Sequence, residues 1–253
     1  MIRRTVGCAV GRALSLYLAA GAMTFGGLLA TTAARGDSVN GSGKAKTEER
    51  SIGDANEVAV SGGGIVEITL GEKPSVRVSA DDNILPLLEV KNENGKLTFG
   101  TKFGYEVNPM TPISYVVTIP QLKKLIVSEI GNVKGVNLKG NALTVELSGA
   151  GHVILNDIDY KSLSLNLEGA GHATLTGAAE SATFRLAGTG KIDADDLKAA
   201  TVDATVSGNG KTTVWATDEL KANVAGSGKV EYKGKPRIEQ SVADEGSIKS
   251  IDD

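Results

Sequence analysis

The sequence predicts an all-β fold, a single-domain parallel β-solenoid with coils of 18–20 residues. First, 32 of the 253 residues are glycine and only 4% are aromatic, a composition that suits short strands joined by tight turns. Second, a Gly-x-Gly or similar turn recurs between Gly131 and Gly246 at steps of 20, 20, 19, 20, 18 and 18 residues. Third, apolar and polar residues alternate on both sides of each turn, which indicates strands with one buried face.

Residues 1–34 have the pattern of a secretory signal peptide. Basic residues near the start are followed by an apolar run of 18 residues, Ala13 to Ala30, and by small residues that predict cleavage after Ala34. The alternative is an uncleaved membrane anchor, because such a run approaches the length that spans a bilayer. We therefore expect export to the periplasm, the outer envelope or the extracellular space, and contact with a membrane only if this segment is retained.

Residues 35–50 are polar and rich in Gly, Ser and Lys, so we expect a flexible linker before a solenoid domain at 51–253. Without residues 1–34, 24 basic and 30 acidic side chains remain, which argues against a nucleic-acid partner. The only cysteine, Cys8, lies in the predicted signal peptide. The exported chain is therefore expected to fold without disulfide bonds.

Residues 56–120 lack the regular period but keep the alternation of apolar and polar residues. The segment from Val58 to Asp81 reads as short strands broken at Gly62–Gly64 and Gly71, and Asn94-Gly95 predicts a hairpin. We expect this irregular strand region to begin the stack and to protect its end, because an open end exposes unpaired backbone groups.

From Gly131 onward, equivalent positions in successive coils share their chemistry. With the last glycine of each turn as the reference, the fourth residue before it is always aliphatic: Val127, Leu147, Leu167, Leu186, Val206, Val224 and Val242. Coils stack at about 4.8 Å, so this column is predicted to form a continuous stripe inside a narrow core. The turn glycines supply the positive-φ conformations that a sharp corner needs.

These features resemble the bacterial auto-transporter adhesin head domain, or head GIN domain, family. The resemblance rests on VAVSGGGIVEITLGEKPSVRVSADDNI, GKLTF and ISYVVTIPQLKKLIVSEIGNV, followed by SGAGHV, EGAGHA, AGTGKI, SGNGKT and AGSGKV. It covers roughly residues 52–250 and depends on the order and spacing of these segments. The resemblance implies a right-handed parallel β-helix that is exported to the envelope and has no established catalytic residues or cofactor.

His152 and His172, the only histidines, occupy the same column on adjacent coils. At the ladder spacing they would lie roughly 5 Å apart, close enough to share a metal ion. Asn132 precedes them in that column, and Lys191, Lys211 and Lys229 follow. A metal site needs three or four convergent ligands, so the preferred interpretation is an exposed polar ladder without a metal.

Three kinds of function remain open from the sequence, one of which is a purely structural envelope protein without a ligand. A non-catalytic adhesin-like or scaffolding module would bind an envelope glycan or a surface protein along its flat faces, with Trp215, Phe103 and Tyr105 as candidate contacts. Trp215 shares a column with Asn156, Thr176, Asp195 and Lys233, so it should point outward or pack under a turn of the next coil. The alternative is a carbohydrate-active enzyme of the polysaccharide lyase or hydrolase type that uses the acids at 193–196. The sequence lacks a recognisable catalytic constellation, so we expect no enzyme.

Overall fold

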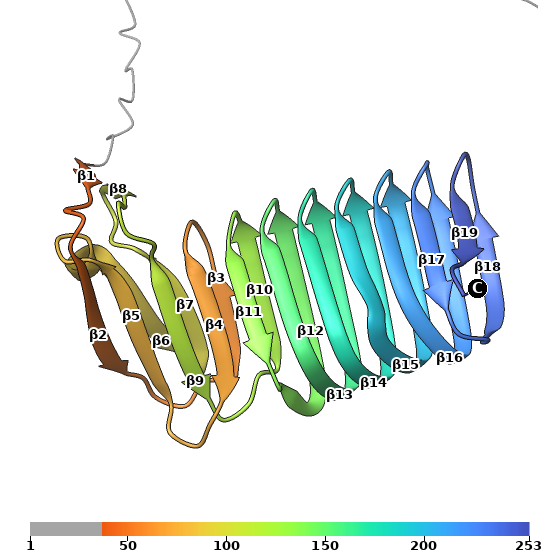
Figure 1. Cartoon of the computed structure of the whole chain (residues 1–253), viewed down its shortest axis with the longest axis horizontal. Coiled ribbons are helices and arrows are strands. Elements are labelled where there is room, and N and C mark those ends of the chain that lie inside the picture. Colours follow the sequence, from red (N-terminus) through yellow and green to blue (C-terminus); the bar gives the residue numbers. More distant parts are fainter. Residues whose placement is uncertain (1–36, 253) are drawn as a thin grey trace, which may run out of the picture. The chain divides into compact units, whose positions relative to one another are not determined.

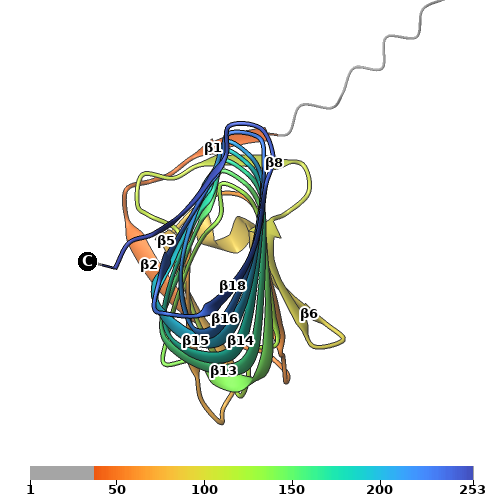
Figure 2. The same cartoon turned by 90° about the vertical axis from the view of Figure 1, so that its right-hand side faces the viewer.

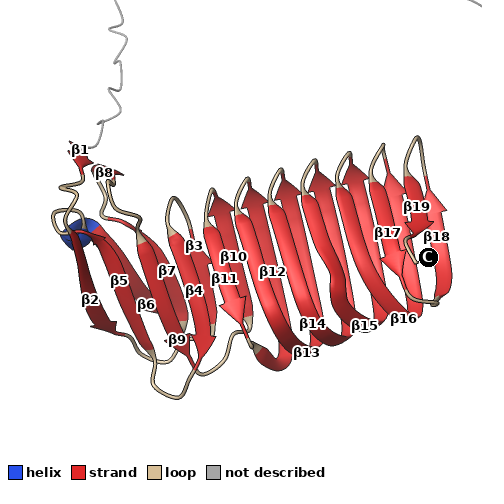
Figure 3. Cartoon of the chain, viewed as in Figure 1, coloured by secondary structure: helices blue, strands red, loops and turns tan. Residues whose placement is uncertain are grey.

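The computed structural model describes residues 37–252, and the predicted signal peptide at 1–34 lies outside them. The described chain is built almost entirely of strands, with one 3-10 turn, η1 (Leu85–Leu87) (Figures 1 and 3). The strands are β1 (Asp37–Asn40), β2 (Ala45–Ser51), β3 (Glu57–Val60), β4 (Ile65–Leu70), β5 (Ser75–Asp81), β6 (Leu88–Glu93), β7 (Lys96–Thr101), β8 (Tyr105–Asn108), β9 (Ser114–Ile119), β10 (Lys124–Glu129), β11 (Asn132–Val136), β12 (Lys139–Gly149), β13 (His152–Gly169), β14 (His172–Gly188), β15 (Lys191–Gly208), β16 (Lys211–Ala225), β17 (Lys229–Lys233), β18 (Arg237–Val242) and β19 (Ser247–Ser250).

The β-solenoid predicted from the sequence is confirmed. Strands β10 to β17 pair in parallel from coil to coil, and Figure 2 shows two facing sides of the bent sheet that enclose a narrow interior. The register follows the predicted columns near the glycine corners, since His152 pairs with His172, His172 with Lys191 and Lys191 with Lys211. Equivalent residues therefore stack as ladders along the length of the solenoid.

The interior contains the predicted aliphatic stripe from Val127 to Val224, whereas Val242 in the last coil is 44% exposed because no further coil covers it. Leu147, Leu167 and Leu186 are at most 2% exposed, and the Val and Ala residues of the neighbouring columns are also buried. Two larger side chains, Tyr160 and Phe184, join this core, and the Tyr160 hydroxyl donates a hydrogen bond to the Leu122 carbonyl oxygen. The narrow space between the sheets explains why small aliphatic residues predominate.

The coils approach one another closely at the glycine corners. The first glycine of each corner has positive φ, and a Cβ there would lie 2.5–2.7 Å from a carbonyl oxygen of the preceding coil. These glycines are Gly149, Gly169, Gly188, Gly208 and Gly226. Backbone geometry and the contact with the neighbouring coil therefore both require glycine.

The N-terminal region begins and covers the stack. Strands β3 and β4 form a regular coil, because Val60 pairs with Val127 and Ile65 pairs with Asn132. Beyond them, β6 and β7 form the predicted antiparallel hairpin around Asn94-Gly95, and both turn residues have positive φ. Strand β5 pairs antiparallel with β9 and ends the parallel order at this side of the stack.

The predicted flexible linker at residues 35–50 is wrong for its described part, which contains β1 and most of β2. Strand β2 pairs antiparallel with β5 along its whole length, and β1 pairs in parallel with β8. Both faces of β2 are largely exposed. Its sequence, AKTEERS, therefore lacks the alternation of apolar and polar residues that marks a strand with one buried face. A charged outermost strand of this kind blunts a sheet edge against unwanted pairing, which explains its linker-like composition.

Candidate functional site

The two histidines are neighbours on the outer surface, as their shared column predicts. Their ring centroids lie 6.1 Å apart and the rings are tilted by 48°. The Nε2 atom of His172 also lies 2.8 Å from an Asp193 carboxylate oxygen. Within residues 37–252, no three side chains of the His, Cys, Asp and Glu types form a metal-binding group. Their geometry is that of a surface ladder with one hydrogen-bonding contact to a carboxylate.

Asp193 joins two rungs of this ladder. Its carboxylate lies 2.7 Å from the Lys191 ammonium group and accepts a hydrogen bond from the Thr213 hydroxyl. Partial burial raises the pKa of Asp193, but hydrogen bonds from Lys191 and His172 lower it by more, so the net pKa lies below its ordinary value. Asp193 is therefore held in its charged form at neutral pH.

Trp215 occupies the predicted column on one side only, because it pairs with Lys233 as expected but not with Asp195. Between β15 and β16 the register shifts after Ala194, so Trp215 pairs with Lys198 and not with Asp195. The coil that contains β15 is longer than its neighbours, and the additional residues bulge at Asp195 and Asp196. The indole is half-buried, and the ammonium group of Lys198 in the preceding coil lies 5.8 Å from its ring centroid. Asp195 and Asp196 both form ion pairs with Lys233.

One outer surface of the solenoid therefore carries an ordered set of charges, which we call the ladder face. Its basic row consists of His152, His172, Lys191, Lys211 and Lys229, which pair in successive strands. The adjacent row contains Thr174, Asp193, Thr213 and Glu231. Asp193 neutralises Lys191, and Glu231 lies 2.8 Å from Lys211.

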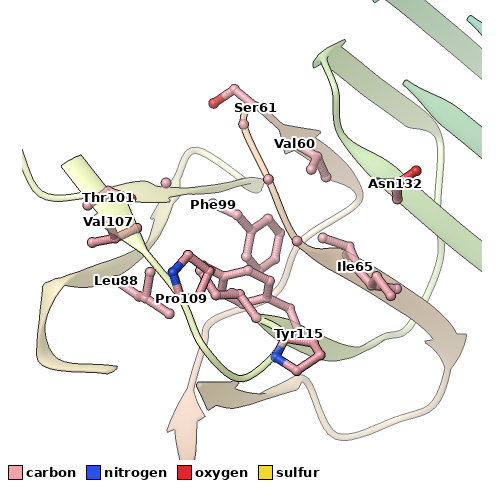
Figure 4. Close-up of a pocket in the computed structure, with 17 residues that line it drawn as sticks. Val60, Ser61, Ile65, Leu88, Phe99, Thr101, Val107, Pro109, Tyr115 and Asn132 are labelled. Carbon is pink, nitrogen blue, oxygen red and sulfur yellow. The ribbon is translucent and has the colours of Figure 1, made fainter. Parts of the chain in front are cut away.

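A second candidate site is an apolar cavity of about 360 Å³ in the N-terminal region (Figure 4). The rings of Phe99 and Tyr115 pack edge to face at 4.8 Å in its lining, next to Val60, Leu88 and Ile113. Sequence reasoning missed this site because the lining residues come from separate strands and loops between positions 60 and 132. Phe103 and Tyr105 are exposed on the connection that covers the cavity, but neither lines it.

Asp81 fixes one rim of the cavity. Its buried carboxylate accepts hydrogen bonds from the backbone N–H groups of Gly43, Met110 and Thr111. Desolvation raises the pKa of Asp81, and the hydrogen bonds from these backbone groups lower it by more, so the net pKa lies below its ordinary value. The ionised carboxylate thus joins the segment before β2 to the segment before β9.

We expect Asp81→Asn to lower the thermal midpoint at neutral pH, because an amide cannot accept all three hydrogen bonds. Because the pKa of Asp81 is lower in the folded state, the ionised carboxylate stabilises the wild-type protein fully above the unfolded-state pKa, near 3.9. This stabilisation is lost as the pH falls through the folded-state pKa. Thermal unfolding of both proteins from about pH 7 to about pH 2.5 should therefore show the difference shrinking only in strong acid. Glu106→Gln, which removes an exposed charge from β8, is the control and should show no such pattern. A constant difference across this range would contradict the role of the ionised carboxylate.

Comparison with known proteins decides the family. The model of the family described as "Putative auto-transporter adhesin, head GIN domain" matches residues 54–236. This chain belongs to that family. No curated protein matches the chain.

Three solved structures resemble this head GIN domain over their full length. A "putative adhesin" from Bacteroides fragilis is 27% identical, with 84% of this chain and 100% of that chain covered and a TM-score of 0.77. A "putative lipid binding protein" from Parabacteroides distasonis is 27% identical, with 85% and 100% covered and a TM-score of 0.72. A "putative adhesin" from Parabacteroides merdae is 26% identical, with 85% and 100% covered and a TM-score of 0.69.

The family match includes both candidate sites of this head GIN domain, since the ladder face and the lining of the cavity lie between residues 54 and 236. The strands β1 and β2 precede the matched range, and β18 and β19 follow it. No helix among residues 37–252 has the length and apolar character needed to cross a membrane.

Proposed function

We propose that this head GIN domain is an exported, non-catalytic binding protein that uses its ladder face to hold an anionic envelope glycan or an acidic surface protein. The basic row is the observation that carries this proposal. Lys191, Lys211 and Lys229 stack on consecutive strands, where like charges about 4.8 Å apart repel one another. Two of these lysines have an acidic neighbour on the face, and a partner with regularly spaced negative charges would stabilise the whole row.

Family membership and the neighbouring structures named adhesins support a binding role and an exported location for the chain. The predicted signal peptide supports the same location. A flat ladder face also suits an extended polymer better than a small molecule, because small molecules are usually held in concave sites.

The rival hypothesis of a carbohydrate-active enzyme has little chemical support at the acids near position 193. Glycosidases pair an ionised carboxylate with a second one whose pKa is raised so that it can donate a proton. Asp193 has a lowered pKa, and Asp195 and Asp196 form ion pairs with Lys233. These contacts favour charged, structural carboxylates.

Binding to anionic polysaccharides and to purified envelope proteins should decrease in the double variant Lys211→Ser/Lys229→Ser. We expect affinity to fall by roughly tenfold, with weaker salt dependence, because about 1.4 kcal/mol of charge attraction corresponds to one decade. Surface plasmon resonance at two salt concentrations measures both effects. Lys161→Ser/Lys221→Ser is the matched control, since it removes two exposed lysines that lie outside the ladder face.

Equal loss of affinity in both double variants would exclude the ladder face as the binding surface. Release of oligosaccharides from the polysaccharides, abolished by Asp193→Ala, would replace the proposal with the enzymatic hypothesis.

A second candidate function is the binding of an apolar ligand in the cavity beneath residues 100–113. The cavity itself favours it, and one structural neighbour is named a lipid-binding protein. This function uses a different part of the chain, so it is compatible with binding at the ladder face.

A further inference from the structure

The cavity exists because one turn of the stack lacks a tight corner. Val60 pairs with Phe99 and Ile65 pairs with Ser114, so the connection at residues 100–113 takes the place that residues 61–64 take in the adjacent coil. A connection of that length cannot lie flat against a narrow glycine corner. The cavity between them is therefore a consequence of strand register.

The glycines of the two kinds of corner show the difference directly. Gly62 is equivalent to Gly149, because Val60 pairs with Val127 and Val127 with Leu147. A Cβ at Gly149 would lie 2.6 Å from the Glu129 carbonyl oxygen, whereas a Cβ at Gly62 would meet no atom within 4 Å. The space that backbone fills between regular coils is open at this corner.

The lining restricts what can fill this space. None of the residues that line the cavity is charged, and most of the surface is aliphatic or aromatic carbon. Burial raises the pKa of Tyr115 to about 12, so its phenol stays neutral at physiological pH. Polar groups such as the hydroxyls of Ser61 and Thr101 and the Asn132 amide are a minority of the lining, so a sugar or a peptide backbone would replace few of its hydrogen bonds to water. These surroundings favour a hydrocarbon as the occupant.

The volume fits a chain of moderate length. An apolar cavity of about 150 Å³ accommodates benzene, so 360 Å³ leaves room for roughly a dozen carbon atoms. Phe103 and Met110 lie on the connection that covers the cavity and are 103% and 72% exposed. Exposed apolar side chains of this kind are suited to contact with a lipid surface or with the rest of an amphiphile.

We infer that the cavity binds a single aliphatic chain, from a free fatty acid or from a phospholipid, and leaves the polar head group outside. This inference rests on the second candidate function and specifies its ligand and position. The chain would lie between the Gly62–Gly64 corner and the connection at residues 100–113, against the rings of Phe99 and Tyr115 (Figure 4).

The test uses the full chain, with sodium dodecanoate as the free fatty acid and phosphatidylglycerol vesicles as the membrane source. Thr101→Trp adds an indole at a half-buried position of the lining, and Thr98→Trp adds the same group at an exposed position of the same strand. Isothermal titration calorimetry should give a negative heat-capacity change for the wild type and for Thr98→Trp. We expect Thr101→Trp to bind roughly tenfold more weakly or worse, because displacing a few methylene groups has that effect.

Thermal unfolding of each variant establishes that it is folded, and Val107→Phe replaces Thr101→Trp if the latter unfolds. Loss of binding in the cavity variant alone supports the inference. Loss of dodecanoate binding would identify a free fatty acid as the origin of the chain, and loss of vesicle binding would identify a phospholipid. Equal binding by all variants would overturn the cavity as the site while retaining a lipid-binding function. Binding of neither probe by the wild type would overturn both the inference and the second candidate function. Neither result would affect the proposal for the ladder face.

Discussion

Leu167→Asp is expected to lower the free energy of unfolding by about 4 kcal/mol or more, which is enough to unfold many domains. Leu167 is 1% exposed and pairs with Leu147 on one side and with Leu186 on the other. A carboxylate at this position would have only the aliphatic side chains of Leu147 and Leu186 as neighbours in its column. The core is narrow, so the charge would also have no room for water. No basic group lies within the stripe to compensate the charge.

Chemical denaturation followed by circular dichroism measures this change. Leu167→Met, which nearly conserves volume, should cost less than about 1.5 kcal/mol and serves as the control. An aspartate variant as stable as the wild type would show that the column does not face the interior.

Gly188→Ala is expected to have the second-largest effect, with a loss of about 2–3 kcal/mol from backbone strain and close contact. Gly188 has a φ of +120°, and a Cβ there would lie 2.5 Å from the carbonyl oxygen of Gly169. The obstacle is backbone in the middle of a stack, so relief would require two coils to separate. The same change elsewhere along the corner stack should act in the same way.

Gly62→Ala serves as the comparison, because Gly62 occupies the equivalent corner with a φ of +81° and no atom within 4 Å of the added Cβ. It should lose only the part of the stability that comes from the backbone conformation. The larger loss expected for Gly188→Ala combines the close contact between coils with the greater strain at a φ of +120°, and urea unfolding measures it. Equal losses would contradict a destabilising contact between coils.

The solenoid could be predicted from the sequence because its stabilising interactions repeat. Each coil presents the same aliphatic column and the same corner glycine, so Leu147, Leu167 and Leu186 identify one another as core residues. The repeat also placed His152 beside His172 correctly. Strand β2 could not be predicted in this way, because an exposed, charged edge strand has no buried face and so its sequence shows no apolar periodicity.

The site was less predictable, for two physical reasons. The contact between His172 and Asp193 joins two different columns of the ladder face, and the repeat relates only residues within one column. Trp215 pairs with Lys233 as predicted but not with Asp195, because a bulge shifts the register of β15 and a count from the glycine cannot detect it. The cavity depends on the long connection between Phe99 and Ser114, whose residues have no repeat to compare.

From β13 to β16 the shifts in register lie at one bend of the solenoid, whereas the long connection at residues 100–113 lies on the side of the glycine corners. They occur between Leu155 and Ile158, between Thr174 and Thr176, and between Ala194 and Lys198, with one more just after Ala199. All of these shifts lie at the bend opposite the glycine corners. At the corners themselves the pairing is continuous, from Gly149 to Gly169, Gly188 and Gly208. Insertions and deletions that arise during evolution can thus be absorbed at this bend without rotating either sheet. Coils can therefore differ in length at this bend while the residues of the ladder face keep their positions.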